Sequence, residues 1–162
     1  MNLMGIGFDA HRFAKKRRLV LGGCEIPYKL GLLGHSDADV LCHAVMDAML
    51  GAVADGDIGH HFPNNDNKWR GVSSIELLKK VTAIVRKRKF TVVNIDTTVL
   101  ADAPKLKDYI LQMRRNIAKT VGITTDRVSV KATTMEGMGA IGRKEGIAAM
   151  AVVSVEDSRK NK

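Results

Sequence analysis

Cysteine, aromatic residues and long apolar runs are all scarce in this chain of 162 residues. Its two cysteines, Cys24 and Cys42, have no metal-motif spacing, so we expect reduced thiols and a cytoplasmic location rather than a disulfide-bonded secreted protein. No apolar run approaches the roughly 20 residues of a membrane-spanning helix. Asp9, His11 and Arg12 interrupt the N-terminal segment, and we therefore expect neither a membrane anchor nor a signal peptide.

Aromatic residues make up only 4% of the chain, although its net charge is +9. Residues 1–81 hold 10 Lys and Arg against 9 Asp and Glu, whereas residues 82–162 hold 16 against 8. A basic half of this kind suits nucleic acid or a phosphorylated small molecule. Single-stranded nucleic acid is usually held on aromatic stacking platforms, which this composition hardly provides. We therefore expect a small phosphorylated ligand and no nucleic-acid partner.

Hydrophobic periodicity predicts a single domain over residues 1–156, followed by a polar tail over 157–162. Helices are expected over about 37–55 with Ser36 as N-cap, from a capping box at Ser73 and Glu76, and from Ala103 to Gly122. Strands are expected over 3–9, 19–21, 24–26, 91–100, 128–133 and 146–155. Helices between strands indicate an α+β, two-layer sandwich with helices on one face of a small mixed β-sheet.

The helix predicted from residue 37 carries an unusual polar stripe, because Asp39, His43 and Asp47 follow one another at intervals of four. Asp9 and His11, two residues apart on a predicted strand, point to one side of it. A carboxylate and two imidazoles, with a fourth position left open, are typical of a catalytic zinc site. Asp47 or Asp39 is expected to accept the second ring N–H of His43. The alternative, that these are independent polar residues at the ends of elements, stays open at this point.

A second cluster, Ala132-Thr133-Thr134-Met135-Glu136, ends a predicted strand with hydroxyls and a carboxylate. Hydroxyls and backbone N–H groups suit phosphate, and a lone carboxylate often binds Mg²⁺ that substrate phosphates also hold. A loop with three glycines then leads to Arg143, which offers a further contact for an anion. The chain contains no phosphate-binding P-loop motif and no nucleophile elbow.

Five segments in this order resemble the 2-C-methyl-D-erythritol 2,4-cyclodiphosphate synthases of the non-mevalonate isoprenoid pathway, over roughly residues 5–156. They are Gly-Phe-Asp-Ala-His-Arg-Phe at 7–13, Gly-Leu-Leu-Gly-His-Ser-Asp-Ala-Asp-Val at 31–40, Asp-Ile-Gly at 57–59 with Phe-Pro at 62–63, Ala-Pro-Lys at 103–105, and Lys-Ala-Thr-Thr-Met-Glu at 131–136. The resemblance implies a phosphorus–oxygen lyase that releases CMP from a cytidine diphosphate substrate as it closes a cyclic diphosphate. It also implies a ferredoxin-like fold and a homotrimer with active sites between subunits.

The resemblance also assigns roles to individual residues. It implies Zn²⁺ at Asp9, His11 and His43, and a second ion, Mg²⁺ or Mn²⁺, at Glu136 with the substrate phosphates. It implies that the residues binding the erythritol and phosphate part are His35, Ser36, Asp57, Gly59 and Phe62. It implies that the residues binding the cytidine diphosphate part are Ala101, Lys105, Ala132, Thr133 and Thr134, with Arg143 and Glu136 near the phosphates. His35 and Thr134 are the expected catalytic residues.

Three positions depart from the family pattern. Asn64 replaces an Asp in the loop that contacts the erythritol, Ala140 replaces a Phe that lines the cavity of the trimer, and Lys144 replaces a Gly beside Arg143.

Overall fold

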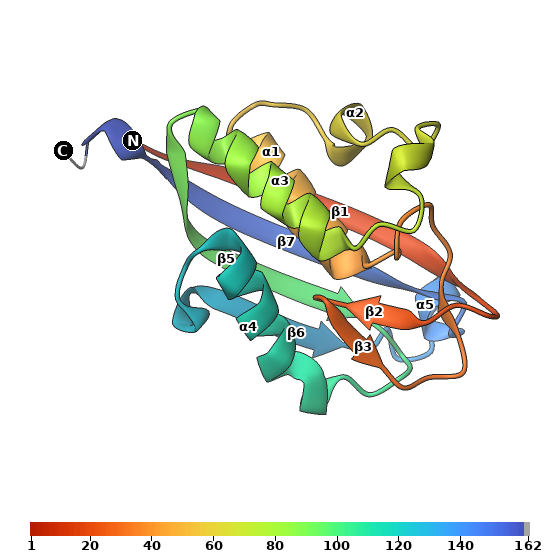
Figure 1. The fold of residues 1–162 in the computed structure, drawn as a ribbon. Helices are drawn as coiled ribbons and strands as arrows, with labels where there is room; N and C mark the ends of the chain where they lie inside the picture. Colours follow the sequence, from red (N-terminus) through yellow and green to blue (C-terminus); the bar gives the residue numbers. More distant parts are fainter. Residues whose placement is uncertain (161–162) are drawn as a thin grey trace.

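The computed structural model describes residues 1–160 (Figure 1). In chain order its elements are β1 (Asn2–Ala14), β2 (Leu19–Leu21), β3 (Cys24–Ile26), β4 (Gly31–Leu32), α1 (Val40–Ala52), α2 (Ile58–His61), α3 (Ser74–Lys87), β5 (Phe90–Leu100), α4 (Ile110–Val121), β6 (Val128–Thr133), α5 (Gly139–Gly142) and β7 (Gly146–Asp157). Within residues 1–160, no helix combines the length and the apolar character needed to cross a bilayer.

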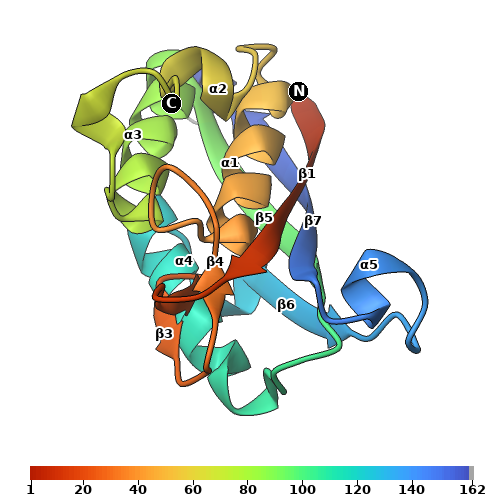
Figure 2. The ribbon, with the colours of Figure 1, turned by 90° about the vertical axis from the view of Figure 1, so that its right-hand side faces the viewer.

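The main sheet has the strand order β4-β1-β7-β5-β6, and β2 and β3 form a separate hairpin. β7 is antiparallel to both of its neighbours, whereas β5 and β6 are parallel. The helices α1, α3 and α4 lie on one face of the sheet, and residues 1–160 leave the opposite face bare apart from the projecting segment with α5 (Figure 2). The predicted mixed sheet with helices on one face is therefore confirmed.

The connectivity differs from the expected ferredoxin-like arrangement. A ferredoxin-like chain runs β-α-β-β-α-β, whereas the main elements here run β1, α1 with α3, β5, α4, β6, β7. The difference arises because α4 joins two parallel strands, β5 and β6, and two parallel neighbours need a crossover connection.

Helix α1 packs directly on the backbone of β1, and this contact depends on two glycines. A Cβ atom added at Gly7 would lie 1.9 Å from the carbonyl oxygen of Ala44, and one at Gly5 would lie 2.0 Å from that of Ala48. Every residue of α1 except Asp47 and Gly51 is buried. The helix is therefore a central core element, and its polar side faces other parts of the protein rather than solvent.

Helix α1 begins three residues later than predicted. Ser36 is not its N-cap, because Asp39 takes that position and accepts a hydrogen bond of 3.0 Å from the backbone N–H of Cys42. Ala38 has a φ of 58°, so a right-handed helix that begins at residue 37 cannot continue through it. Helix α3 does begin after Ser73 as predicted, with the Ser73 hydroxyl accepting from the N–H of Ile75.

Other boundaries also differ from the prediction. The third predicted helix, α4, begins at Ile110 rather than at Ala103, because a 3₁₀ turn over Lys107–Tyr109 comes first. The predicted start of the polar tail at residue 157 is too early, because Asp157 is still part of β7 and is buried. Residues 161–162 of that tail lie outside the described residues.

Replacing Gly7 with Ala should destabilise the protein by about 1–3 kcal/mol, because the added methyl group meets helix backbone that cannot give way. Chemical denaturation monitored by circular dichroism measures this change. Gly51→Ala is the matched control: its Cβ would have only one neighbour, 3.8 Å away, and it should stabilise α1 by about 0.5–1 kcal/mol. Equal effects of the two substitutions would contradict the proposed close contact.

Candidate metal centre and adjoining cavities

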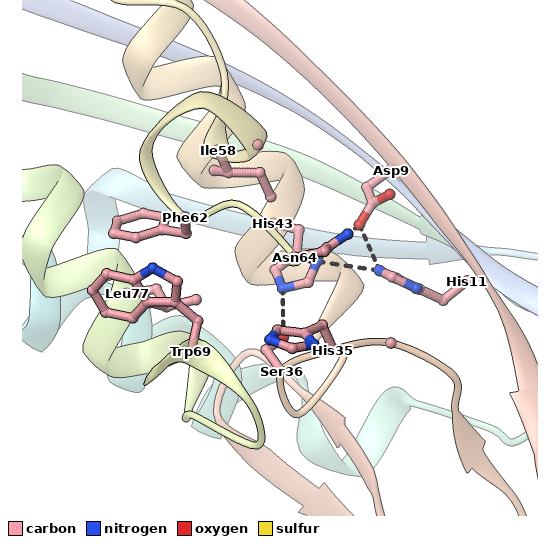
Figure 3. Close-up of a pocket in the computed structure, with 12 residues that line it drawn as sticks. Asp9, His11, His35, Ser36, His43, Ile58, Phe62, Asn64, Trp69 and Leu77 are labelled. Atoms are coloured by element: carbon pink, nitrogen blue, oxygen red, sulfur yellow. Dashed lines mark hydrogen bonds and ion pairs between the residues drawn. The ribbon is translucent and has the colours of Figure 1, made fainter. Parts of the chain in front are cut away.

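Asp9, His11 and His43 converge on one point between β1 and α1 (Figure 3). Asp9 Oδ2 lies 2.8 Å from His11 Nε2 and 2.9 Å from His43 Nδ1, and the two ring nitrogens are 3.2 Å apart. Asp9 and His11 share a side of β1 because side chains two apart in a strand point the same way. His43 meets them because α1 lies directly against β1. The structure therefore assembles the three predicted ligands, and no other such group occurs among residues 1–160.

The donor set fits a divalent metal ion. The backbone carbonyl of Leu33, which can only accept, lies 2.7 Å from His11 Nδ1, so this nitrogen carries the ring proton. In the neutral imidazole Nε2 then has a free lone pair, which faces the Asp9 carboxylate. A carboxylate and imidazole nitrogens at such spacing are three ligands of an open tetrahedral zinc site.

The electrostatics of this group also favour a cation. Burial opposes ionisation of Asp9, but hydrogen bonding and electrostatic attraction from the imidazole rings of His11 and His43 outweigh it and hold the pKa of Asp9 well below its usual range. Burial likewise disfavours a charged His11, yet the hydrogen bond and charge of Asp9 raise the pKa of His11. The carboxylate and the ring nitrogens therefore stabilise a positive charge at this point. That charge can be a proton on an imidazole or a bound metal ion.

The second ring nitrogen of His43 does not meet Asp39 or Asp47, so that prediction is wrong. His43 Nε2 lies 3.1 Å from the hydroxyl oxygens of both Ser36 and Ser74. Asp39 instead accepts from the backbone N–H groups of residues 22, 23 and 42, and Asp47 accepts from that of residue 58. Both carboxylates are therefore hydrogen-bonded to backbone N–H groups instead of to His43. The spacing of residues along one helix cannot predict these partners, because most of them come from other parts of the chain.

A cavity of about 210 Å³ adjoins the metal ligands. Four residues expected to bind the erythritol and phosphate part line it, namely His35, Ser36, Gly59 and Phe62. Asp57, the fifth, does not line it, because its carboxylate caps α2 by accepting from the N–H of His60. Asn64, a departure from the family pattern, does line the cavity.

One wall of this cavity is apolar, and the sequence reading did not identify it. Ile58, Trp69 and Leu77 line it together with Phe62, whose ring meets that of Trp69 edge-on at a centroid distance of 5.0 Å (Figure 3). Trp69 is the only tryptophan of the chain and stands in the long loop over 57–72. A single tryptophan in this loop is the one sequence signal for the apolar wall.

The loop that carries His35 and Ser36 is held from two sides. The backbone carbonyl of His35 accepts a 2.8 Å hydrogen bond from the N–H of Gly71, which belongs to the long loop over 57–72. The carbonyl of Ser36 accepts a 2.7 Å bond from the guanidinium of Arg17. The basic run over 15–18 forms the turn between β1 and β2, and Arg17 within it is a structural contact rather than a free surface charge.

A second cavity, of about 420 Å³, lies where β5 and β6 end. The residues expected to bind the cytidine diphosphate part line it together, namely Ala101, Lys105, Ala132, Thr133 and Thr134. Glu136 is close, because its carboxylate accepts a 3.2 Å hydrogen bond from the Thr134 hydroxyl. Arg143 is exposed and pairs with Glu145. The two cavities share no lining residue.

Comparison with known proteins agrees with this arrangement. The YgbB family model matches residues 3–156. The chain is 55% identical to the 2-C-methyl-D-erythritol 2,4-cyclodiphosphate synthase of Alkaliphilus metalliredigens and 54% identical to that of Syntrophomonas wolfei, in each case over 96% of this chain and at least 98% of the relative.

Solved structures show the same similarity. The bifunctional IspDF of Campylobacter jejuni has a TM-score of 0.93 and 45% identity over 98% of this chain, which spans 44% of that longer protein. A Plasmodium falciparum IspF in complex with CDP has a TM-score of 0.84 and 30% identity over 96% of both chains.

Replacing His43 with Ala should abolish zinc binding, because it removes one of three ligands, while the far-UV circular dichroism spectrum stays that of a folded protein. Equilibrium dialysis followed by metal analysis gives the zinc content per chain. His60→Ala is the matched control, since this exposed histidine lies outside the ligand group and its loss should leave the zinc content unchanged. Retention of one zinc ion per chain in His43→Ala would refute the ligand assignment.

Proposed function

The chain belongs to the YgbB family, and we propose that Asp9, His11 and His43 form the metal centre of a 2-C-methyl-D-erythritol 2,4-cyclodiphosphate synthase. The enzyme converts 4-diphosphocytidyl-2-C-methyl-D-erythritol 2-phosphate to the 2,4-cyclodiphosphate and releases CMP. An oxygen of the 2-phosphate attacks the β-phosphorus, and the bond from that phosphorus to the oxygen of CMP breaks. The convergence of these three side chains beside a cavity is the observation that carries the proposal.

The chain needs no general base for this reaction, because an ionised phosphate is already a nucleophile. Its residues must instead bring the two phosphates together and offset their charge. Zn²⁺ held by Asp9, His11 and His43 would supply Lewis-acid polarisation of a phosphate oxygen. Glu136 would hold the second ion, Mg²⁺ or Mn²⁺, together with the substrate phosphates.

His35 and Ser36 are proposed to bind the end of the substrate that carries the 2-phosphate. Ser36 Oγ accepts from the backbone N–H of Ala38, and among residues 1–160 its own proton has no acceptor other than the ring of His43. That hydroxyl is therefore available to donate to a phosphate oxygen in the cavity. Phe62 and the N–H of Gly59 would bound the methylerythritol, with Asp57 fixing the short helix α2 that presents them.

The cavity at the ends of β5 and β6 is proposed to bind the cytidine diphosphate part. It combines apolar side chains, such as Pro104 and Leu106, with the hydroxyls of Thr133 and Thr134 and the ammonium group of Lys105. This composition suits a flat base attached to charged phosphates. Thr134 and Arg143 would orient the phosphates. Solved relatives that contain CDP support the assignment.

Assembly as a homotrimer through the bare face of the sheet is the proposed quaternary structure. On β1 the side chains of Met4, Ile6 and Phe8 are 71%, 67% and 58% exposed, and Met150 and Val152 of β7 continue this apolar surface. A contiguous apolar surface on a soluble chain usually marks an interface. The two cavities have no residue in common, so a neighbouring subunit can bring its cytidine cavity to the metal centre. A cytoplasmic location is part of the same proposal.

Replacing Thr134 with Ala should lower kcat by about 10²–10³, because it removes a hydroxyl that orients the transferred phosphate. Thr134→Ser is the matched control and should keep a kcat near that of the parent, since it retains the hydroxyl. The assay follows CMP and the cyclic diphosphate by ³¹P NMR. CMP with an open-chain product in place of the cyclic one would identify a hydrolase and contradict the proposed function.

Replacing Ile6 with Asp should convert the trimer to monomers, because it places a charge in the centre of the apolar interface. Size-exclusion chromatography with light scattering measures the mass. Leu111→Asp, on the helical side of the molecule and 48% exposed, is the control and should leave a trimer. A parent protein that is monomeric at micromolar concentration would refute the proposed assembly.

A further inference from the structure

A buried serine connects the metal ligand His43 to a carboxylate behind it. Ser74, the first residue of α3, is 0% exposed. Its hydroxyl oxygen lies 2.5 Å from Asp37 Oδ1 and 3.1 Å from His43 Nε2. The backbone N–H of Ser74 also donates to Asp37 Oδ2, at 3.0 Å, so that the serine and the carboxylate are joined twice.

The chemistry of these groups decides the direction of each hydrogen bond. An ionised carboxylate only accepts, so the single proton of the Ser74 hydroxyl points to Asp37. The hydroxyl oxygen then offers only lone pairs to His43, and His43 Nε2 must be the donor. A neutral imidazole with its proton on Nε2 has its lone pair on Nδ1. That nitrogen is the one that lies 2.9 Å from Asp9 and 3.2 Å from His11.

The other hydroxyl near His43 does not impose this direction. Ser36 Oγ also lies 3.1 Å from Nε2. This oxygen accepts a hydrogen bond from the N–H of Ala38, which leaves the proton of the Ser36 hydroxyl free to point in either direction. Ser36 by itself is compatible with a proton on either nitrogen of His43. The carboxylate behind Ser74 removes this freedom, because it takes up the proton that a lone serine would be able to donate to the ring.

We infer that Asp37 and Ser74 are positioning residues for the metal centre, which hold His43 with its proton on Nε2 and its Nδ1 lone pair aimed at the metal. This inference rests on the proposed function, since it concerns the same metal centre. The negative charge of Asp37, acting through the Ser74 hydroxyl, also makes the Nδ1 lone pair of His43 a stronger ligand for a metal ion. Neither residue was singled out for such a role from the sequence.

Zinc affinity, measured by competition with a chelator, tests the inference in Ser74→Ala and Asp37→Asn. Loss of an outer partner of a metal-bound histidine typically weakens metal binding by 10- to 100-fold, and we expect a loss of this size in Ser74→Ala. Asp37→Asn keeps the shape of the side chain but not its charge, and should weaken binding in the same direction. Most of the effect of Asp37→Asn on zinc affinity should disappear in the Ser74→Ala background, because the Asp37 carboxylate reaches the His43 ring through the serine hydroxyl. The other contact of Asp37 Oδ1, a 3.2 Å hydrogen bond accepted from the N–H of Asp39, is common to both backgrounds.

Ser73→Ala is the matched control, because Ser73 is the adjacent serine and caps α3 by accepting from the N–H of Ile75 without touching the metal centre. It should lower the midpoint of thermal unfolding but leave the zinc affinity unchanged. If Ser74→Ala bound zinc as tightly as Ser73→Ala did, the inference would be overturned while the metal centre stood. A parent protein that binds no zinc would overturn the proposed metal centre and the inference with it.

The proton on His43 gives a second readout that does not depend on activity. In the zinc-loaded parent, NMR of histidine rings labelled with ¹⁵N should show a proton on Nε2 of His43 that exchanges slowly with solvent, because it is buried and hydrogen-bonded. In Asp37→Asn this exchange should accelerate at least tenfold. Unchanged exchange in a folded Asp37→Asn variant would also overturn the inference.

Discussion

The direct contact between α1 and the backbone of β1 is the constraint on which the metal centre depends. Gly5 and Gly7 remove the side chains that would hold the helix away, and they stand just before Asp9 in the same strand. Ala44, whose carbonyl approaches Gly7, is the neighbour of His43. The glycines therefore set the distance between helix and sheet, and that distance brings the ring of His43 within 3.2 Å of both other ligands.

The same close packing explains why polar groups in and before α1 need partners inside the protein. Asp39 is 0% exposed, and its burial raises its pKa, while three backbone N–H groups offset part of this cost. His43 is almost as deeply buried; its Nε2 faces the hydroxyl of Ser74, and its Nδ1 faces the carboxylate of Asp9. Water cannot hydrogen-bond to these buried polar atoms, so each of them needs a partner within the protein. Such fixed partners make the arrangement rigid.

Much of the fold could be predicted from local patterns, whereas the partners of the metal ligands could not. The alternation in residues 128–133 and the apolar residues of 146–155 correctly indicated strands, and the structure places the first at the edge of the sheet and the second in its centre. Asp9, His11 and His43 were identified because their spacing suggested a metal site and the family resemblance assigned the ligands to them. Ser74 was missed because its role comes from the packing of α3 against α1, between residues 31 positions apart. The start of α1 was misplaced because Ser36 and Asp39 are both good caps, and tertiary contacts with residues 22 and 23 favour Asp39.

The long loop over 57–72 is part of the site through its contacts. Its Gly71 binds the carbonyl of His35, its Val72 binds the N–H of Asp37, and its Trp69 closes one side of the cavity. The loop that carries His35 and Ser36 is thus held by backbone hydrogen bonds to a second loop, whereas Gly59 lies in the short helix α2. The metal ligands are fixed in a different way, because they come from β1 and α1, which pack directly on each other. A reaction in which the enzyme must fold a flexible substrate back on itself needs both, since the reacting groups have to be held in one geometry.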